Sequence, residues 1–411
     1  MSRVKAYAVC PTPLSGAKVK KATRQQTKTH NTRLILKTIY ERGQISRADI
    51  ARLTRLTPTT VSDIVGELLL DGLVKEIGHG PSAGGKPPTL LSTVDDARHL
   101  IGIDLASDAF RGAVVNLRGR IKHRLHLAID DLDGTQALNR VYDLIDGLLR
   151  VTDVPILGIG IGSPGLMDAA HGIVINSVNL GWRNLPLRDL LQERYDLPVY
   201  IANDCQVAAL GEFTFGDNKG QPSLVLIRLG RGVGAGIILN QQLYFGDGGY
   251  GAGEIGHIMV QENGELCMCG HYGCLETVAS SRAIVRQVKE QFKERQIAMP
   301  GGGNSDNLTF EAVKQALLND DPVVCQVVER AGSYVGYVIN SLVCALGIRH
   351  VVLTGQVTEL GAYLLDPIYH QLRQGSLATL AEETLISVSN LGPDLVILGA
   401  AALVLTQEVG L

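Results

Sequence analysis

The sequence contains no long apolar run. None of its 411 residues lies in a stretch approaching the ~20 consecutive apolar residues that a membrane-spanning helix needs. The N-terminal residues also lack the apolar core of a secretory signal peptide. These absences exclude a helical membrane protein and predict a cytoplasmic one. An apolar content of 45% over this length predicts two or three globular domains.

Cysteine and tryptophan are scarce as well. The single tryptophan, Trp182, is more typical of a core position than of a surface that stacks on a ligand. Three of the seven cysteines, Cys267, Cys269 and Cys274, fall within eight positions. Because disulfides are rare in the cytoplasm, this clustering predicts a metal site rather than cross-links.

These cysteines lie in a glycine-rich segment, GAGEIGHIMVQENGELCMCGHYGCLE, that has no apolar periodicity. Ordinary buried cysteines are the alternative, but three so close together fit that interpretation poorly. His257 adds an imidazole to the three thiolates, and such a set can close a tetrahedral zinc site. Spacing alone leaves His271 as a competing ligand, because Cys-x-Cys is tighter than the usual ligand spacing.

Two carboxylates, Glu254 and Glu276, flank the predicted zinc site. A structural zinc would hold this loop rigid. Rigid carboxylates make the directional hydrogen bonds that hydroxyl-rich ligands such as sugars need.

The pattern Glu254-x-x-His257 with Cys267-x-Cys269-Gly-x-x-Gly-Cys274-x-Glu276 closely resembles the signature of the ROK family, which groups sugar kinases and sugar-responsive repressors. The resemblance implies that the histidine and the three cysteines hold zinc. It also implies that the two glutamates and the histidine face a sugar.

The first ninety residues are basic, with 15 Lys and Arg against 6 Asp and Glu, whereas the remainder has 23 against 35. This excess predicts an anionic partner. Residues 1–30 have no apolar period and are interpreted as a flexible basic arm, with an inert solvated tail as the alternative.

Residues 31–95 are predicted to form a winged helix-turn-helix. Apolar residues at helical spacing predict three short helices, the second starting at Ser46 and the third at Thr57. Two short strands with a Gly/Pro-rich tip follow. Resemblance to the DNA-binding arms of ROK repressors favours DNA over a protein-docking role. The predicted contacts to bases and phosphates are Thr57, Thr59, Thr60, Ser62 and, on the wing tip, Lys86.

From Leu100 the pattern is that of an α/β protein. Residues 100–129 indicate three consecutive strands, and residues 223–246 repeat a strand, a glycine-rich turn and a returning strand. Two such starts predict duplicated lobes with a cleft between them, and the resemblance implies the actin-like, ribonuclease-H-like fold of ROK kinases. The first lobe is assigned to residues 96–220, joined by a closing helix in 395–411, and the second, with the zinc site, to 221–394.

A strand in the first lobe ends at Asn203 and Asp204, where a helix begins. A carboxylate there is placed to act as a general base for a sugar hydroxyl, although a helix cap is the simpler interpretation. The resemblance implies that both residues bind sugar, with Asp204 in the kinase base position. It extends less specifically to Gly165 and Asn179.

The phosphate-binding turns differ from those of the kinases. Kinases of the family carry Asp-x-Gly-Gly-Thr in the first turn, where this chain has Asp104 and Leu105 followed by Ala106, Ser107 and Asp108. Glycines bring backbone amides close to phosphates, so their loss and the added Asp108 predict weak ATP binding. In the second turn Arg231 replaces the usual threonine, and an attraction for a sugar phosphate is one conceivable role for it.

These observations predict a transcriptional repressor that binds an inverted-repeat operator as a homodimer or homotetramer. Its effector is predicted to be a monosaccharide or a sugar phosphate. One alternative is an active sugar kinase that also binds DNA, with Asp204 as the base. Another is a DNA-binding or partner-binding protein with a vestigial sugar site, which the retained Glu254, His257 and Glu276 disfavour.

Overall fold

The computed structural model describes residues 23–81, 87–106, 108–129, 132–218, 220–297, 308–375 and 377–410. It forms two compact units that meet in the sequence between Thr93 and Val94. Of the residues singled out above, Lys86, Ser107 and residues 1–22 of the basic arm lie outside the described part.

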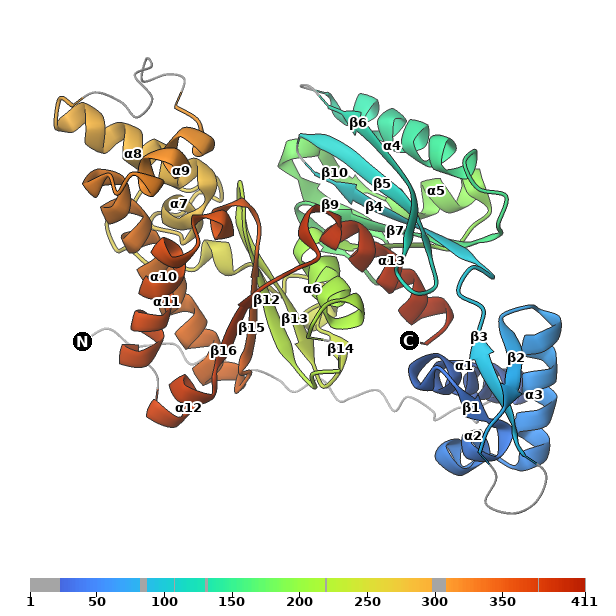
Figure 1. Ribbon diagram of the computed structural model, residues 1–411. Helices are drawn as coiled ribbons and strands as arrows, with labels where there is room; N and C mark the ends of the chain where they lie inside the picture. Colours follow the sequence, from blue (N-terminus) through green and yellow to red (C-terminus); the bar gives the residue numbers. More distant parts are fainter. Residues whose placement is uncertain are drawn as a thin grey trace, which may run out of the picture. The chain divides into compact units, whose positions relative to one another are not determined.

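The N-terminal unit is a winged helix-turn-helix (Figure 1). Its three strands form one sheet in the order β1-β3-β2. The predicted caps are present, because the Ser46 side chain accepts from the Asp49 amide and Thr57 accepts from the Thr60 amide. The elements are α1 (Arg24–Arg42), β1 (Ile45–Ser46), α2 (Arg47–Thr54), α3 (Pro58–Leu70), β2 (Val74–His79) and β3 (Thr89–Thr93).

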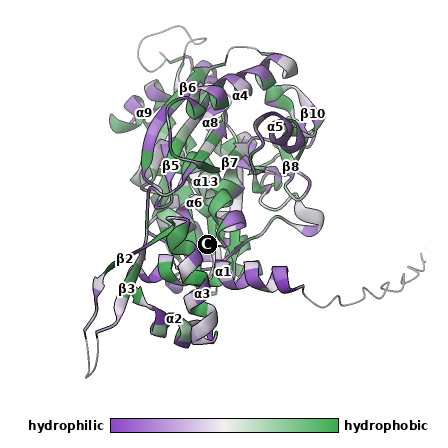
Figure 2. Ribbon diagram, turned by 90° about the vertical axis from the view of Figure 1, so that its right-hand side faces the viewer, coloured by the Kyte–Doolittle hydropathy of each residue, from purple (hydrophilic) through white to green (hydrophobic). Residues whose placement is uncertain are grey.

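Helix α1 begins earlier than predicted, so residues 24–30 are helical and not part of an extended arm. The reason is a capping box in which Thr23 and Gln26 each bond the backbone amide of the other. The first turns are polar (Figure 2), and a Lys28 to Glu67 ion pair of 2.6 Å joins them to α3. Apolar periodicity was therefore the wrong signal for this end of the helix.

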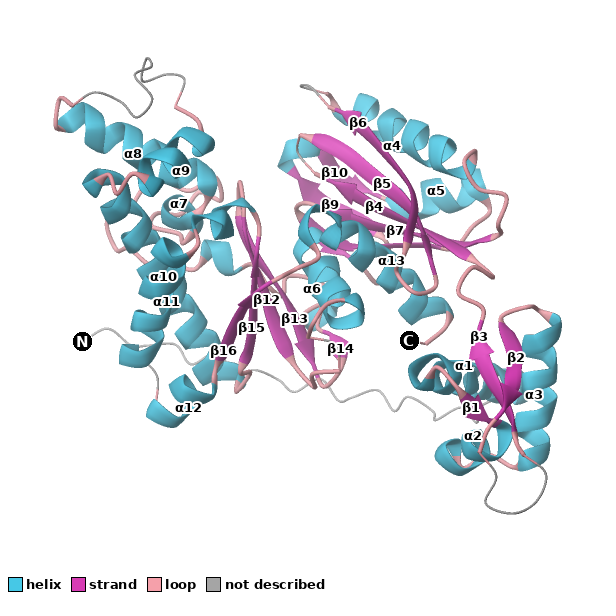
Figure 3. Ribbon diagram, in the orientation of Figure 1, coloured by secondary structure: helices cyan, strands magenta, loops and turns pink. Residues whose placement is uncertain are grey.

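The C-terminal unit contains two five-stranded sheets, shown in magenta in Figure 3, and a small third one. The first large sheet has the order β11-β7-β4-β5-β6, the second β14-β13-β12-β15-β16, and the small one β10-β9-β8. The strands are β4 (His99–Leu105), β5 (Ala109–Asn116), β6 (Ile121–Ala128), β7 (Ile156–Ser163), β8 (Leu166–Asp168), β9 (Ile173–Ser177), β10 (Trp182–Leu185), β11 (Val199–Asn203), β12 (Leu224–Leu229), β13 (Val233–Leu239), β14 (Gln242–Leu243), β15 (His350–Thr354) and β16 (Leu385–Val388).

Helices cover both large sheets. In chain order they are α4 (Gly134–Leu149), α5 (Leu187–Tyr195), α6 (Asp204–Phe215), α7 (Glu276–Ala279), α8 (Ser281–Glu294), α9 (Phe310–Leu318), α10 (Pro322–Leu346), α11 (Ala362–Gly375), α12 (Ala378–Glu383) and α13 (Leu395–Glu408). Among the described residues, no helix is long and apolar enough to cross a membrane.

The two large sheets repeat one design, as the two strand starts predicted. Strand β4 pairs antiparallel with β5 and parallel with β7, and β12 pairs antiparallel with β13 and parallel with β15. The sheet of β4 defines the first lobe and the sheet of β12 the second. This duplication confirms the predicted two-lobed α/β architecture.

The last helix, α13, packs on the first-lobe sheet through close backbone approaches. A Cβ added to Gly102 on β4 would lie 2.2 Å from the Ile397 carbonyl oxygen, and one on Gly160 of β7 would lie 1.8 Å from that of Ala400. Only glycine permits such contacts. Helices α6 and α13 share an apolar core with β12 and β15, so they connect the two lobes.

Candidate functional site

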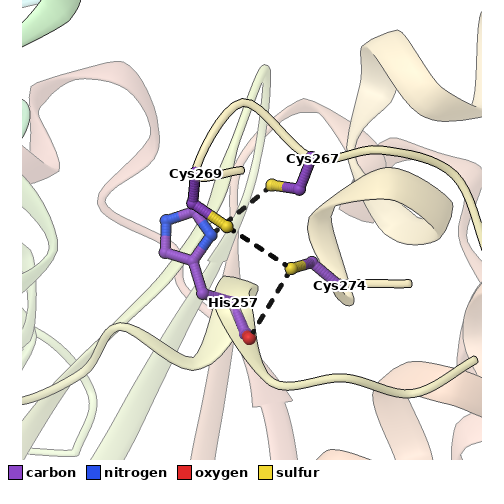
Figure 4. Close-up of side chains that lie close together, drawn as sticks. All are labelled: His257, Cys267, Cys269 and Cys274. Carbon is purple, nitrogen blue, oxygen red and sulfur yellow. Dashed lines mark hydrogen bonds between the residues drawn. The ribbon is translucent and has the colours of Figure 1, made fainter. Parts of the chain in front are cut away.

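The predicted metal ligands converge in one cluster. Figure 4 shows the imidazole of His257 and the thiols of Cys267, Cys269 and Cys274 pointing toward one another. Their ligand atoms all lie within 4.8 Å of one another. The nearest pairs are Cys267 Sγ to His257 Nδ1 at 3.6 Å and Cys269 Sγ to Cys274 Sγ at 3.7 Å. One nitrogen and three sulfurs suit a four-coordinate metal ion.

Backbone contacts shape the loop that carries these ligands. Isolated antiparallel bridges join Met259 to Cys274 and Leu266 to Tyr272. His271, the competing ligand by spacing, places its Nδ1 3.6 Å from Cys269 Sγ but does not belong to the four-residue cluster. The geometry therefore favours His257.

His257 links this cluster to the flanking carboxylates. Its Nδ1 faces Cys267, and its Nε2 lies 3.9 Å from an Oε2 of Glu254. If His257 Nδ1 binds a metal ion, its Nε2 can still bond to the Glu254 carboxylate or to a ligand. Burial raises the pKa of Glu254, and the nearby charges of Asp204 and Glu276 raise it further, against the opposing effect of His257.

The glycine-rich turn between β12 and β13 holds Glu276 in place. The Val233 amide donates to Glu276 Oε2 at 3.0 Å, and a Cβ on Gly232 would lie 2.7 Å from that same oxygen. Glu276 thus has a fixed orientation at the start of α7. Two other predicted sugar residues, Asp204 and Glu276, lie close enough to Glu254 to contribute to the rise of its pKa.

Asn203 is both a helix cap and part of the predicted sugar set. Its side-chain oxygen accepts from the Cys205 amide at 2.9 Å, and its Nδ2 donates to the Gly165 carbonyl at 3.0 Å. Gly165 has φ +98° and packs against Ser177, just before the turn Val178–Leu180 that contains Asn179. The bond from Asn203 to the Gly165 carbonyl brings these two residues together. Asn179 lies two positions after Ser177, against which Gly165 packs.

Sequence reasoning missed Arg228. It lies on β12 and forms an ion pair with Asp204. Asp104, at the end of β4, is buried nearby; burial raises its pKa to about 6 despite the opposing charge of Arg228. The sequence feature that could have identified Arg228 was a positively charged residue inside the otherwise apolar strand LVLIRL.

The first phosphate turn carries a fixed negative charge. Asp108 is paired with Arg111, and this contact lowers the pKa of Asp108 although partial burial acts in the opposite direction. Ala106 supplies a side chain where kinases carry glycine. In the second turn, Gly230 and Gly232 are joined by a backbone bond of 2.9 Å, and Arg231 between them is exposed.

The predicted DNA contacts on α3 divide into two groups. The Thr57 hydroxyl lies 2.8 Å from that of Thr60 and accepts from the Thr60 amide, so both hydroxyls take part in the helix cap. Thr59 and Ser62 are exposed. Arg55, in the turn between α2 and α3, is a further exposed cation that the sequence reading did not single out.

Comparisons with known proteins agree with both units. The profile of the ROK family matches residues 100–407, and the profile described as winged helix-turn-helix DNA-binding matches residues 28–75. A xylose repressor from Caldicellulosiruptor bescii is 34% identical, over 92% of this chain and 96% of the relative. A glucokinase from Halalkalibacterium halodurans is also 34% identical, over 76% of this chain and 96% of its own length.

A solved structure matches nearly the whole chain. It is described as a ROK family transcriptional regulator, a homologue of the E. coli MLC protein, and superposes with a TM-score of 0.84 at 27% identity. The match covers 93% of this chain and 97% of the other.

Proposed function

The chain belongs to the ROK family, and from this premise we propose that it is a sugar-responsive transcriptional repressor. The observation that carries the proposal is the joining of a winged helix-turn-helix to a ROK domain in one chain. The xylose repressor of similar length has matching sequence through both parts. A protein that binds operator DNA works where the chromosome is, which in bacteria is the cytoplasm.

The effector is proposed to be a sugar held by carboxylates and amides. Asp204, Glu254 and Glu276 offer oxygen acceptors for hydroxyl groups, and Asn203 and Gly165 lie beside Asp204 in the fold. The bonds to the Val233 and Cys205 amides orient two of these groups before any ligand arrives. Such preorganisation reduces the entropy cost of binding.

The metal is proposed to be a single structural zinc per chain. His257, Cys267, Cys269 and Cys274 would supply four protein ligands, the number typical of a structural zinc site with no position open for catalysis. The ion supplies rigidity to the loop between Glu254 and Glu276. A homodimer or homotetramer is proposed to bind an inverted repeat, because two-fold protein symmetry is mirrored in operator symmetry.

The segment after the wing favours coupling between effector and DNA. Strand β3 ends at Thr93 and β4 begins at His99. The residues between them are bonded to the β5–β6 hairpin: the Asp95 carbonyl accepts from the Leu117 amide at 3.0 Å, and the Asp96 carboxylate accepts from Asn116 at 3.0 Å. Because Asp95 and Asp96 are hydrogen-bonded to the first lobe, this linker is expected to move with that lobe, whereas an unbonded linker would not.

We therefore expect operator DNA to change the affinity for the effector. A coupling free energy of about 1–3 kcal/mol corresponds to roughly 5- to 150-fold, and thermodynamic linkage makes the factor equal in both directions. Calorimetric titration of sugar, with and without operator DNA, measures it. Equal affinities for a sugar that does bind would show that the site is not coupled to DNA binding.

An active sugar kinase is the second candidate, favoured by Asp204 and by the 34% identity to a glucokinase. Against it stand the charge of Asp108 in the first phosphate turn and the Arg228 partner of Asp204. We expect no turnover at ordinary kinase rates, about 1–100 per second, when the protein is incubated with ATP and a panel of hexoses. Turnover in that range would replace the repressor proposal by a bifunctional enzyme.

A further inference from the structure

Arg228 lies outside the metal cluster, between the carboxylates of Asp204 and Asp104 in electrostatic terms. Its Nη1 bonds to Asp204 Oδ2, and its side chain remains 30% exposed while that of Asp204 is 16% exposed. Asp104 lies within electrostatic reach of both. Arg228 lies on β12 of the second lobe, whereas Asp104 lies on β4 and Asp204 follows β11, both of the first lobe, so a second-lobe guanidinium meets first-lobe carboxylates.

Asp104 depends on this arrangement. Its side chain is 95% buried, and among the described residues its Oδ1 has no hydrogen-bond partner. Its other cation, Arg111, lies at 3.9 Å and is bonded to Asp108. A buried carboxylate without a hydrogen-bonded cation costs folding free energy. The charge of Arg228 is therefore needed inside the protein and is not available to bind an anionic ligand.

Two further carboxylates among the proposed sugar residues add negative charge to the site. Glu254 and Glu276 have no arginine or lysine partner among the described residues. Arg228 is already paired with Asp204, and Arg111 is engaged by Asp108. Carboxylates accept hydrogen bonds from neutral hydroxyls, but they repel phosphate or carboxylate groups in a partly screened site.

We propose that Arg228 is a positioning residue that holds Asp204 in a site selective for an uncharged monosaccharide, and that the carboxylates of this site discriminate against phosphorylated or acidic sugars. The charge of Arg228 is used internally to hold Asp204 as an acceptor for a hydroxyl group. This inference rests on the proposed function, because it names the class of effector for the same site. Arg231, exposed in the neighbouring turn, is a cation that would act in the opposite direction.

Calorimetry with the full chain tests the class of ligand. The probes are D-xylose, D-glucose, N-acetylglucosamine, D-glucose 6-phosphate, N-acetylglucosamine 6-phosphate and D-glucuronate. We expect an uncharged sugar to bind on the order of 100-fold more tightly than its charged counterpart, the scale of one like-charge contact at partial screening. Tighter binding of a phosphate or uronate overturns the inference but leaves the repressor proposal standing. Binding of none of the probes, charged or uncharged, counts against both.

Substitutions then test the role of Arg228. Arg228→Met should lower affinity for the uncharged sugar at least about 10-fold, whereas Arg228→Lys should keep most of it, since one unpaired buried charge is costly. Adding Asp104→Asn to Arg228→Met removes one of the two competing carboxylates and should restore part of the affinity. Arg124→Met, which breaks the exposed Arg124 to Asp394 pair, is the matched control and should change nothing.

The double variant also addresses folding. If Arg228→Met is unfolded by circular dichroism, the Lys and double variants carry the test. A folded Arg228→Met protein with wild-type affinity for the uncharged sugar shows that Arg228 does not position Asp204 for the effector.

Discussion

Replacing Cys267 by serine is expected to remove zinc from the protein and abolish effector binding. The cysteine is buried and its sulfur lies 3.6 Å from His257 Nδ1, so serine deletes one of four ligands at the centre of the cluster. Loss of outer-sphere partners alone costs metal sites about 10- to 100-fold in affinity, and loss of a ligand should cost more. Without the metal, the loop between Glu254 and Glu276 is expected to lose its rigidity, and Glu254 its fixed position.

Elemental analysis and sugar calorimetry on the same preparation measure both effects. Cys344→Ser is the matched control, because this exposed thiol on α10 bonds to Asn340 and lies outside the cluster. It should retain one zinc per chain and full affinity. Wild-type protein without zinc would refute the metal assignment, and a zinc-free Cys267→Ser protein with full sugar affinity would refute the structural role of the metal.

Removing the N-terminal unit is expected to abolish operator binding. Specific protein–DNA complexes are typically at least about 1,000-fold tighter than non-specific ones, and the shortened chain should lose all of that difference. The cut belongs before Val94, because Asp95 and Asp96 bond to the β5–β6 hairpin of the remaining unit. Fluorescence anisotropy with a labelled operator measures the loss, and retained zinc shows that the shortened chain is folded.

Point substitutions within the unit separate sequence reading from general attraction. Thr59→Ala, at an exposed position on α3, should change which operator sequence is preferred. Lys86→Ala should weaken binding to all sequences alike and reduce its salt dependence. Undiminished operator binding by the shortened chain would mean that DNA is bound elsewhere in the protein.

Much of this architecture could be predicted because its signals are local. The caps at Ser46 and Thr57, the paired strand starts at residues 100 and 223, and the cysteine spacing each involve residues close in sequence. The metal cluster needed one longer link, from His257 to Cys267, and the family resemblance supplied it. The structure then favoured His257 over His271 by placing its Nδ1 beside a sulfur.

The remainder could not be predicted because it depends on how distant segments pack. Arg228 and Asp204 are 24 positions apart, and nothing in the sequence LVLIRL tells which carboxylate its arginine will meet. Thr60 looked available for DNA, but its hydroxyl is engaged with Thr57 in three dimensions. The start of α1 escaped notice because its first turns are stabilised by a capping box and not by burial.

The packing of α13 on β4 and β7 has a consequence for the order in which the protein is made. The ribosome releases the winged unit first and the helix that completes the first-lobe core last. Until α13, which begins at residue 395, has left the ribosome, the sheet surface at Gly102 and Gly160 lacks the helix that packs on it. A chain that stops before residue 395 therefore has a complete winged helix-turn-helix joined to an incomplete first-lobe core, so nonsense mutations within α13 are expected to disturb the C-terminal unit before the N-terminal one.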